Sequence, residues 1–168
     1  MRFPWTKSKF PPIARGVEVY FDKSRFLICP AVYAASQLNG PGTPYESLER
    51  SIPSASLGQA VRNALERSRI DLADSEFDME VRQVLREANV TSIDDLATAW
   101  SLIRVEEVES GLTVSPMHRC ADGGYASFQG DPVFTCLLNS SSIGTTICDA
   151  VSSMTDEMVD LGEDIGHY

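Results

Sequence analysis

The sequence predicts a single α+β domain in which helices pack on one face of a mostly antiparallel sheet. Three observations lead to this prediction. The chain has 168 residues, which is enough for one self-sufficient hydrophobic core. Apolar residues alternate with a period of two early in the chain and again in its second half, whereas the middle shows the helical period of 3.6. The expected strands follow one another too closely for the crossovers of a parallel sheet.

The first quarter of the chain is expected to hold an extended arm and a β-hairpin. Residues 1–12 contain three prolines among basic and aromatic residues, a composition typical of an extended arm. Apolar and other side chains alternate over residues 17–22, and the apolar run 25–29 follows after a short break. This spacing indicates a hairpin. Prolines and glycines exclude a long regular element over residues 39–44.

Three amphipathic helices are expected in the middle of the chain. The first begins at Ser56, because Ser56 and Gln59 match a capping box. The second has Ser75 as its candidate cap and Asn89 near its end. The third is short and begins after Ser92.

Antiparallel strands and one more helix are expected after the third helix. Strands around residues 103–105 and 112–114 are separated by a turn-prone Ser-Gly pair. A further strand is expected around residues 125–128, and residues 133–138 form an apolar run of strand length. Serines at 140–142 then offer caps for the last helix.

The folded domain is placed at residues 13–154, and residues 155–168 are expected to form a frayed acidic tail. No apolar stretch reaches the roughly 18 residues of a membrane-spanning helix, and the first ten residues lack the apolar core of a signal peptide. We therefore expect a cytoplasmic protein that contacts no membrane. The four cysteines have no CxxC spacing and no nearby histidines suited to zinc, so we expect reduced thiols, no metal and no cofactor.

The net charge of −10 is unevenly distributed. Residues 71–109 carry eleven acids and three bases, and residues 120–168 carry eight acids and no Lys or Arg. Such a surface repels phosphate, so we expect no nucleic-acid binding. An acidic field instead steers a basic protein partner. Simple solvation of acidic helix faces is the alternative explanation.

Few residues suggest catalysis. His118 lies two residues before Cys120, but a catalytic thiol and its imidazole usually come from distant elements. Asp94 and Asp95 stand in the first turn of an expected helix, where the helix dipole accounts for them. The common nucleotide-binding, metalloprotease and serine-hydrolase motifs are missing from the sequence.

The first expected helix carries the pattern LG-x-A-x3-AL-x-x-SR after an N-terminal strand pair. The matching residues are Leu57, Gly58, Ala60, Ala64, Leu65, Ser68 and Arg69. With the order of elements, this pattern resembles the immunity proteins of bacterial contact-dependent growth inhibition (CDI) systems over about residues 13–140. The resemblance implies a cytoplasmic, non-enzymatic toxin inhibitor. Such a protein binds and neutralises the C-terminal toxin domain, commonly a nuclease, that a neighbouring cell delivers.

Two acidic clusters are expected to face a basic toxin domain. One surrounds the start of the second helix, and the other crowds a strand end, where mutual repulsion gives no local benefit. The six expected partner-binding residues are Asp71, Asp74, Glu76, Glu106, Glu107 and Glu109. Two other functions stay open: a small cytoplasmic acidic adaptor or complex subunit, and a small hydrolase that uses Cys120 and His118.

Overall fold

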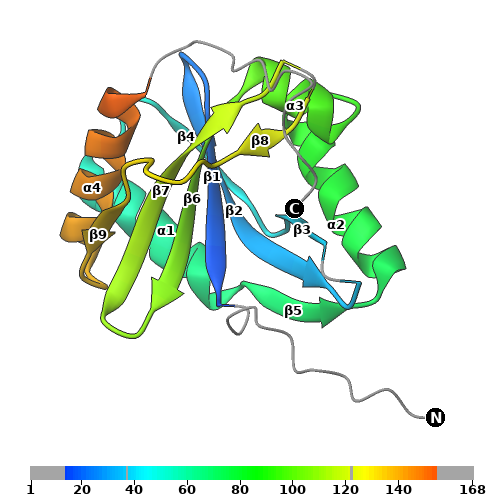
Figure 1. The fold of residues 1–168 in the computed structure, drawn as a ribbon, viewed down its shortest axis with the longest axis horizontal. Helices are drawn as coiled ribbons and strands as arrows, with labels where there is room; N and C mark the ends of the chain where they lie inside the picture. Colours follow the sequence, from blue (N-terminus) through cyan, green and yellow to red (C-terminus); the bar gives the residue numbers. More distant parts are fainter. Residues whose placement is uncertain (1–13, 37, 122, 155–168) are drawn as a thin grey trace.

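A mostly antiparallel sheet forms the centre of the molecule, as Figure 1 shows. The computed structural model describes residues 14–36, 38–121 and 123–154, and these hold nine strands and four helices. The strands are β1 (Gly16–Phe21), β2 (Arg25–Ala34), β3 (Asn39–Pro41), β4 (Glu46–Glu49), β5 (Arg69–Leu72), β6 (Ser101–Val108), β7 (Gly111–Arg119), β8 (Tyr125–Ala126) and β9 (Phe134–Cys136). The helices are α1 (Ser54–Glu66), α2 (Asp74–Glu87), α3 (Ile93–Ala99) and α4 (Ser140–Ser153).

The strand order is β3-β2-β1-β6-β7-β8, with β4 and β5 also paired to β2 and β9 paired to β7. The predicted hairpins β1–β2 and β6–β7 are both present. The sheet is mostly antiparallel, as predicted, and the exception is β5, which pairs with β2 in parallel. Helix α1 ends at Glu66, earlier than predicted. It lies in the connection that leads from β2 to its parallel neighbour β5.

Helices cover both faces of the sheet. The α+β class is confirmed, but the expectation that helices lie on one face was wrong. Val17 and Val19 of β1 pack in a cluster with α1 and α4, whereas Tyr20 packs in a second cluster with α2 and α3. Consecutive strand residues point to opposite faces, and every residue of β1 is buried because β1 lies between β2 and β6. Tyr20 and Glu18 are therefore buried instead of marking a solvent face.

The helix starts differ in part from the expected caps. Helix α1 begins directly after Pro53, and no side chain caps it, so the capping box at Ser56 does not form. Helix α2 begins one residue before Ser75, again without a side-chain cap. The cap at Ser92 is confirmed, because its side chain accepts a hydrogen bond from a backbone N–H of α3. For α4, Asn139 is the capping residue in place of the predicted serines.

Helices α1 and α4 cross with their backbones in contact at two glycines. A Cβ atom on Gly58 would lie 1.8 Å from the carbonyl oxygen of Ser140, and one on Gly144 would lie 1.7 Å from that of Ser54. Only a residue without a side chain allows this approach. Gly58 of the α1 sequence pattern therefore has a structural role.

The predicted arm at residues 1–12 and the predicted tail at residues 155–168 lie outside the described residues, so the domain limits stay predictions. None of the helices described is both long and apolar enough to span a membrane.

Candidate functional site

The predicted acidic cluster at the end of β6 is divided between two faces. Glu106 and Glu107 are consecutive on β6 and therefore point to opposite sides of the sheet. Glu106 and Glu109 are exposed. Glu107 accepts two hydrogen bonds from Arg15, at 2.7 Å from Nε and 2.8 Å from Nη2. The three carboxylates do not form one compact cluster.

Glu107 has a local partner, contrary to the expectation that these acids gain nothing locally. The hydrogen bonds from the Arg15 guanidinium lower the pKa of the Glu107 carboxyl group, although partial burial opposes this shift. Both side chains are substantially exposed, so the pair contributes only about 0.2–1 kcal/mol to folding stability. Glu107 thus stays accessible as a charge on the surface.

The second predicted cluster lies where β5 meets α2. Asp71, Asp74 and Glu76 are all exposed. Asp74 accepts a hydrogen bond of 2.9 Å from the Ser36 hydroxyl, and Asp74 and Glu76 stand in the first turn of α2, where the helix dipole favours acids. In Figure 1 this corner and the β6–β7 turn both lie along the lower edge of the molecule. The two predicted clusters therefore lie at the same end of the sheet but at opposite corners of the molecule, the β6–β7 turn on the left and the start of α2 on the right.

The last two residues of the α1 sequence pattern hold the fold together. The hydroxyl of Ser68 accepts a hydrogen bond from the backbone N–H of Gly16 (3.1 Å) and donates one to the carbonyl oxygen of Ala31 (2.8 Å). Arg69 forms an ion pair of 2.8 Å with Glu80. These contacts connect β1, β2, β5 and α2, so the pattern is explained by architecture.

A buried ion pair, which the sequence analysis did not single out, lies between β1 and β6. Glu18 is 2% exposed and accepts hydrogen bonds from Tyr20 Oη and, at 3.2 Å, from Arg104 Nη2. Burial and the nearby Glu18 carboxylate raise the pKa of Tyr20 well above its usual range. The Glu18 carboxylate therefore has both a cation and a hydroxyl donor. The sequence feature that could have indicated this buried pair is Glu18 itself, an acid between apolar residues of a predicted strand.

His118 pairs with a carboxylate that the sequence analysis also missed. Its Nε2 lies 3.0 Å from Oδ1 of Asp131, and its ring packs against Phe128 with ring centroids 5.1 Å apart. Cys120 is 3% exposed, and its thiol donates to the main-chain carbonyl oxygen of His118 at 3.9 Å. This geometry does not place the thiol on the imidazole, as a Cys–His nucleophile requires.

Two adjoining hollows lie at the end of the sheet opposite the acidic edge. The first, of about 230 Å³, is lined by His118 and Asp131. The second, of about 630 Å³, is lined by three bases, Lys23, Arg50 and Arg119. The described part of the chain holds no group of His, Cys, Asp and Glu side chains that could bind a metal ion.

Comparison with known proteins identifies structures of the same fold. No family model and no curated protein matches the sequence. A protein of unknown function from Neisseria meningitidis has a TM-score of 0.64 and 14% identity, over 88% of this chain and 99% of that chain. A chain of the CdiA-CT/CdiI toxin and immunity complex from Yersinia pseudotuberculosis has a TM-score of 0.64 and 12% identity, over 86% and 99% respectively. At these identities the likeness shows a shared fold.

Proposed function

We propose that this protein is a bacterial immunity protein that binds and neutralises the toxin domain of a CDI system. The observation that carries the proposal is the fold shared with a chain of a toxin and immunity complex, over 86% of this chain and 99% of that one. A shared fold says nothing about location, partner charge or toxin activity. We further propose that the protein acts in the cytoplasm, that its partner is a basic toxin domain, and that this toxin is a nuclease.

Charge favours the immunity role over the toxin role. A nuclease toxin must hold phosphate groups with Lys and Arg side chains. This chain has a net charge of −10, and six of its acids occupy one end of the fold. The geometry around His118 and Cys120 also lacks the thiol–imidazole contact of a cysteine hydrolase.

The acidic end is the proposed binding surface for the basic toxin domain. Its carboxylates attract the approaching partner. On the toxin domain they would occupy the sites that otherwise bind phosphate, or cover a neighbouring surface and block access to those sites. The proposed contact residues are Asp71, Asp74, Glu76, Glu106, Glu107 and Glu109.

An immunity function predicts that the cognate toxin domain is encoded immediately upstream of this protein's gene, and the test is binding to that domain. The two purified proteins are mixed, and complex formation is measured by size-exclusion chromatography and calorimetry. We expect a 1:1 complex, and a toxin domain from an unrelated CDI system serves as the control that should not bind. A protein that binds neither domain would instead fit the adaptor or complex-subunit function.

A further inference from the structure

Three large apolar side chains are exposed where the β6–β7 turn meets the end of β9. Val108 is 40% exposed, Leu137 64% and Leu138 44%. Val108 and Leu137 line the same hollow of about 290 Å³, and Leu138 directly follows Leu137 in the chain. We call these three residues the β9 patch. Single exposed apolar residues are common on soluble proteins, but a contiguous group with a hollow is typical of a binding surface.

The backbone beneath the β9 patch is held in place by strand pairing. Strand β9 pairs with β7, with Leu112 opposite Cys136. At Gly111 a Cβ atom would lie 2.3 Å from the carbonyl oxygen of Cys136, so the β6–β7 turn contacts the β9 backbone directly. Val108 ends β6, and Leu137 and Leu138 form the start of the short connection from β9 to α4, so regular elements anchor the β9 patch on both sides.

Acidic side chains border the β9 patch. Leu138 lines a hollow of about 160 Å³ together with Glu66 and Glu107. Glu109 immediately precedes Ser110, which lines the hollow shared by Val108 and Leu137. An apolar centre surrounded by charged groups is the usual anatomy of a protein–protein interface.

The bases near the β9 patch do not reverse its charge. Arg15 and Arg62 line the same hollow as Leu138, but Arg15 forms an ion pair with Glu107. The border thus holds three acids, Glu66, Glu107 and Glu109, against these two bases, and its formal charge of −1 suits a basic partner.

We propose that the β9 patch is the apolar centre of the surface that binds the toxin domain, with the neighbouring acids as its rim. This inference rests on the proposed function, and it adds a location and a kind of contact. The partner surface it requires carries apolar side chains among Lys and Arg. The rim attracts the toxin domain, and the β9 patch holds it after docking.

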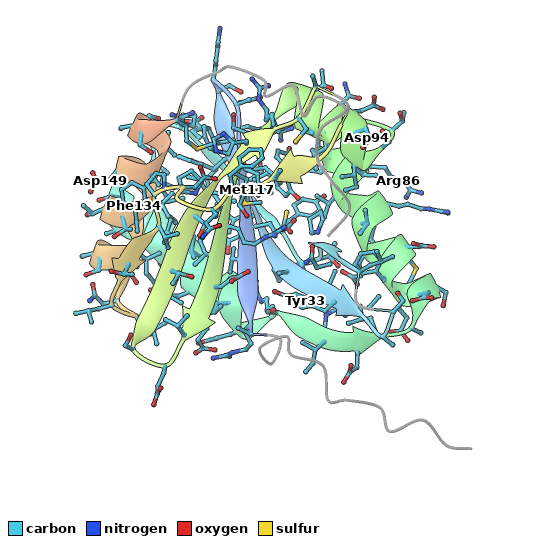
Figure 2. The ribbon with its side chains drawn as sticks, in the orientation of Figure 1. Tyr33, Arg86, Asp94, Met117, Phe134 and Asp149 are labelled. Atoms are coloured by element: carbon cyan, nitrogen blue, oxygen red, sulfur yellow. The ribbon has the colours of Figure 1, made fainter. Side chains whose placement is uncertain are left out.

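Figure 1 shows that β9 and α4 lie on one side of the molecule and α2 on the opposite side. In Figure 2 the labelled Phe134 of β9 and Asp149 of α4 likewise lie together, far from Arg86 of α2. Helix α2 begins with the second acidic cluster, so the control is taken from neither side. Phe128 is 38% exposed, close to the exposed fraction of Leu138, and it packs against His118 at the end of the sheet opposite the acidic edge. It therefore provides a matched control away from both acidic clusters.

The test compares three full-length variants, Leu137→Ala, Leu138→Ala and Phe128→Ala, by surface plasmon resonance on the immobilised upstream-encoded toxin domain. Each leucine variant should bind about tenfold more weakly, mainly through faster dissociation, as expected for anchors at an interface centre. The salt dependence of association should not change, because no charge is altered. Phe128→Ala should stay within about twofold of the wild type, since exposed substitutions away from the interface have small effects.

The outcomes separate this inference from the proposed function. If the wild-type protein does not bind the toxin domain, the proposed function itself fails. If the wild type binds and both leucine variants bind equally well, only the β9 patch is excluded. Leu137→Asp provides a stronger version of the same test. If light scattering shows that wild-type dimers become monomers in the leucine variants without a change in toxin binding, the β9 patch is a self-association surface and the inference is wrong.

Discussion

Replacing Gly58 by Ala separates two physical effects of opposite sign. Helix propensity alone predicts stabilisation, since Ala is favoured over Gly within a helix by about 1 kcal/mol. Packing predicts the reverse. The new Cβ would lie 1.8 Å from the carbonyl oxygen of Ser140 and 2.9 Å from the backbone nitrogen of Gly144. Both contacts are with backbone atoms, so α1 and α4 must move apart.

The packing cost should exceed the propensity gain. Forcing a methyl group into a filled site costs about 1–3 kcal/mol, and separating the helices also uncovers Leu57, Ile143 and Ile147, which are fully buried. We therefore expect a packing cost of about 3 kcal/mol and a net loss of about 2 kcal/mol. For a chain of this size the loss corresponds to a fall in Tm of about 4–8 °C.

The assay is equilibrium unfolding in urea together with a thermal melt. Ser56→Ala on the exposed side of the same helix is the control, because Ser56 forms no cap and its replacement should change stability by less than about 0.5 kcal/mol. A Gly58→Ala variant as stable as the wild type would refute the close helix crossing. A loss of about 1 kcal/mol in Ser56→Ala would instead indicate that Ser56 caps the helix, as the capping-box prediction requires.

Three further predictions concern charge. Hydrogen bonds from Arg69 and Thr43 outweigh burial and lower the pKa of Glu80, so its stabilising effect is present above the ordinary carboxyl pKa and is lost as the pH falls through the folded-state pKa. Glu80→Gln should thus cost about 1–2 kcal/mol at neutral pH and progressively less as the pH falls below the ordinary carboxyl pKa, and a cost that does not change with pH would contradict the assigned hydrogen bonds. Arg104→Met leaves the Glu18 carboxylate buried without its cation and should lower the free energy of unfolding in urea by about 3 kcal/mol. A loss below about 1 kcal/mol would show that the buried Glu18 does not depend on Arg104. Neutralising one acidic cluster should slow toxin association and flatten its salt dependence with little loss of stability, whereas unchanged rates at two ionic strengths would remove that cluster from the interface. The residues changed to Gln are Glu106, Glu107 and Glu109.

Periodicity predicted the hairpins and helices but not how the sheet is covered. The alternation in β1 looked one-sided because Glu18 and Tyr20 are polar or amphipathic. In the structure Arg104, across the β1–β6 pair, and the Tyr20 hydroxyl satisfy the Glu18 carboxylate, and this allows the second face to be buried. Strand β5 has little apolar signal, since three of its four residues are exposed. Such a strand depends on its pairing with β2, which local sequence does not encode.

The candidate site was predictable only in part for similar reasons. Acids that are adjacent in sequence suggested one cluster, but neighbouring residues of a strand face opposite sides, so Glu106 and Glu107 separate. Cys120 and His118 are close in sequence, but the imidazole is engaged by Asp131 from a separate loop. The exposed Leu137 belongs to the run 133–138, which resembled a buried strand, but β9 covers only Phe134–Cys136 and leaves Leu137 in the connection to α4 at the surface.

The most direct test of the central claim is a growth measurement in a susceptible bacterium. The toxin domain encoded immediately upstream is expressed inside the cells from an inducible promoter, with or without this protein. We predict that cells stop growing when the toxin domain is expressed alone and grow normally when this protein is present, while a toxin domain from an unrelated CDI system still stops growth. Equal growth arrest with and without this protein would contradict the immunity function.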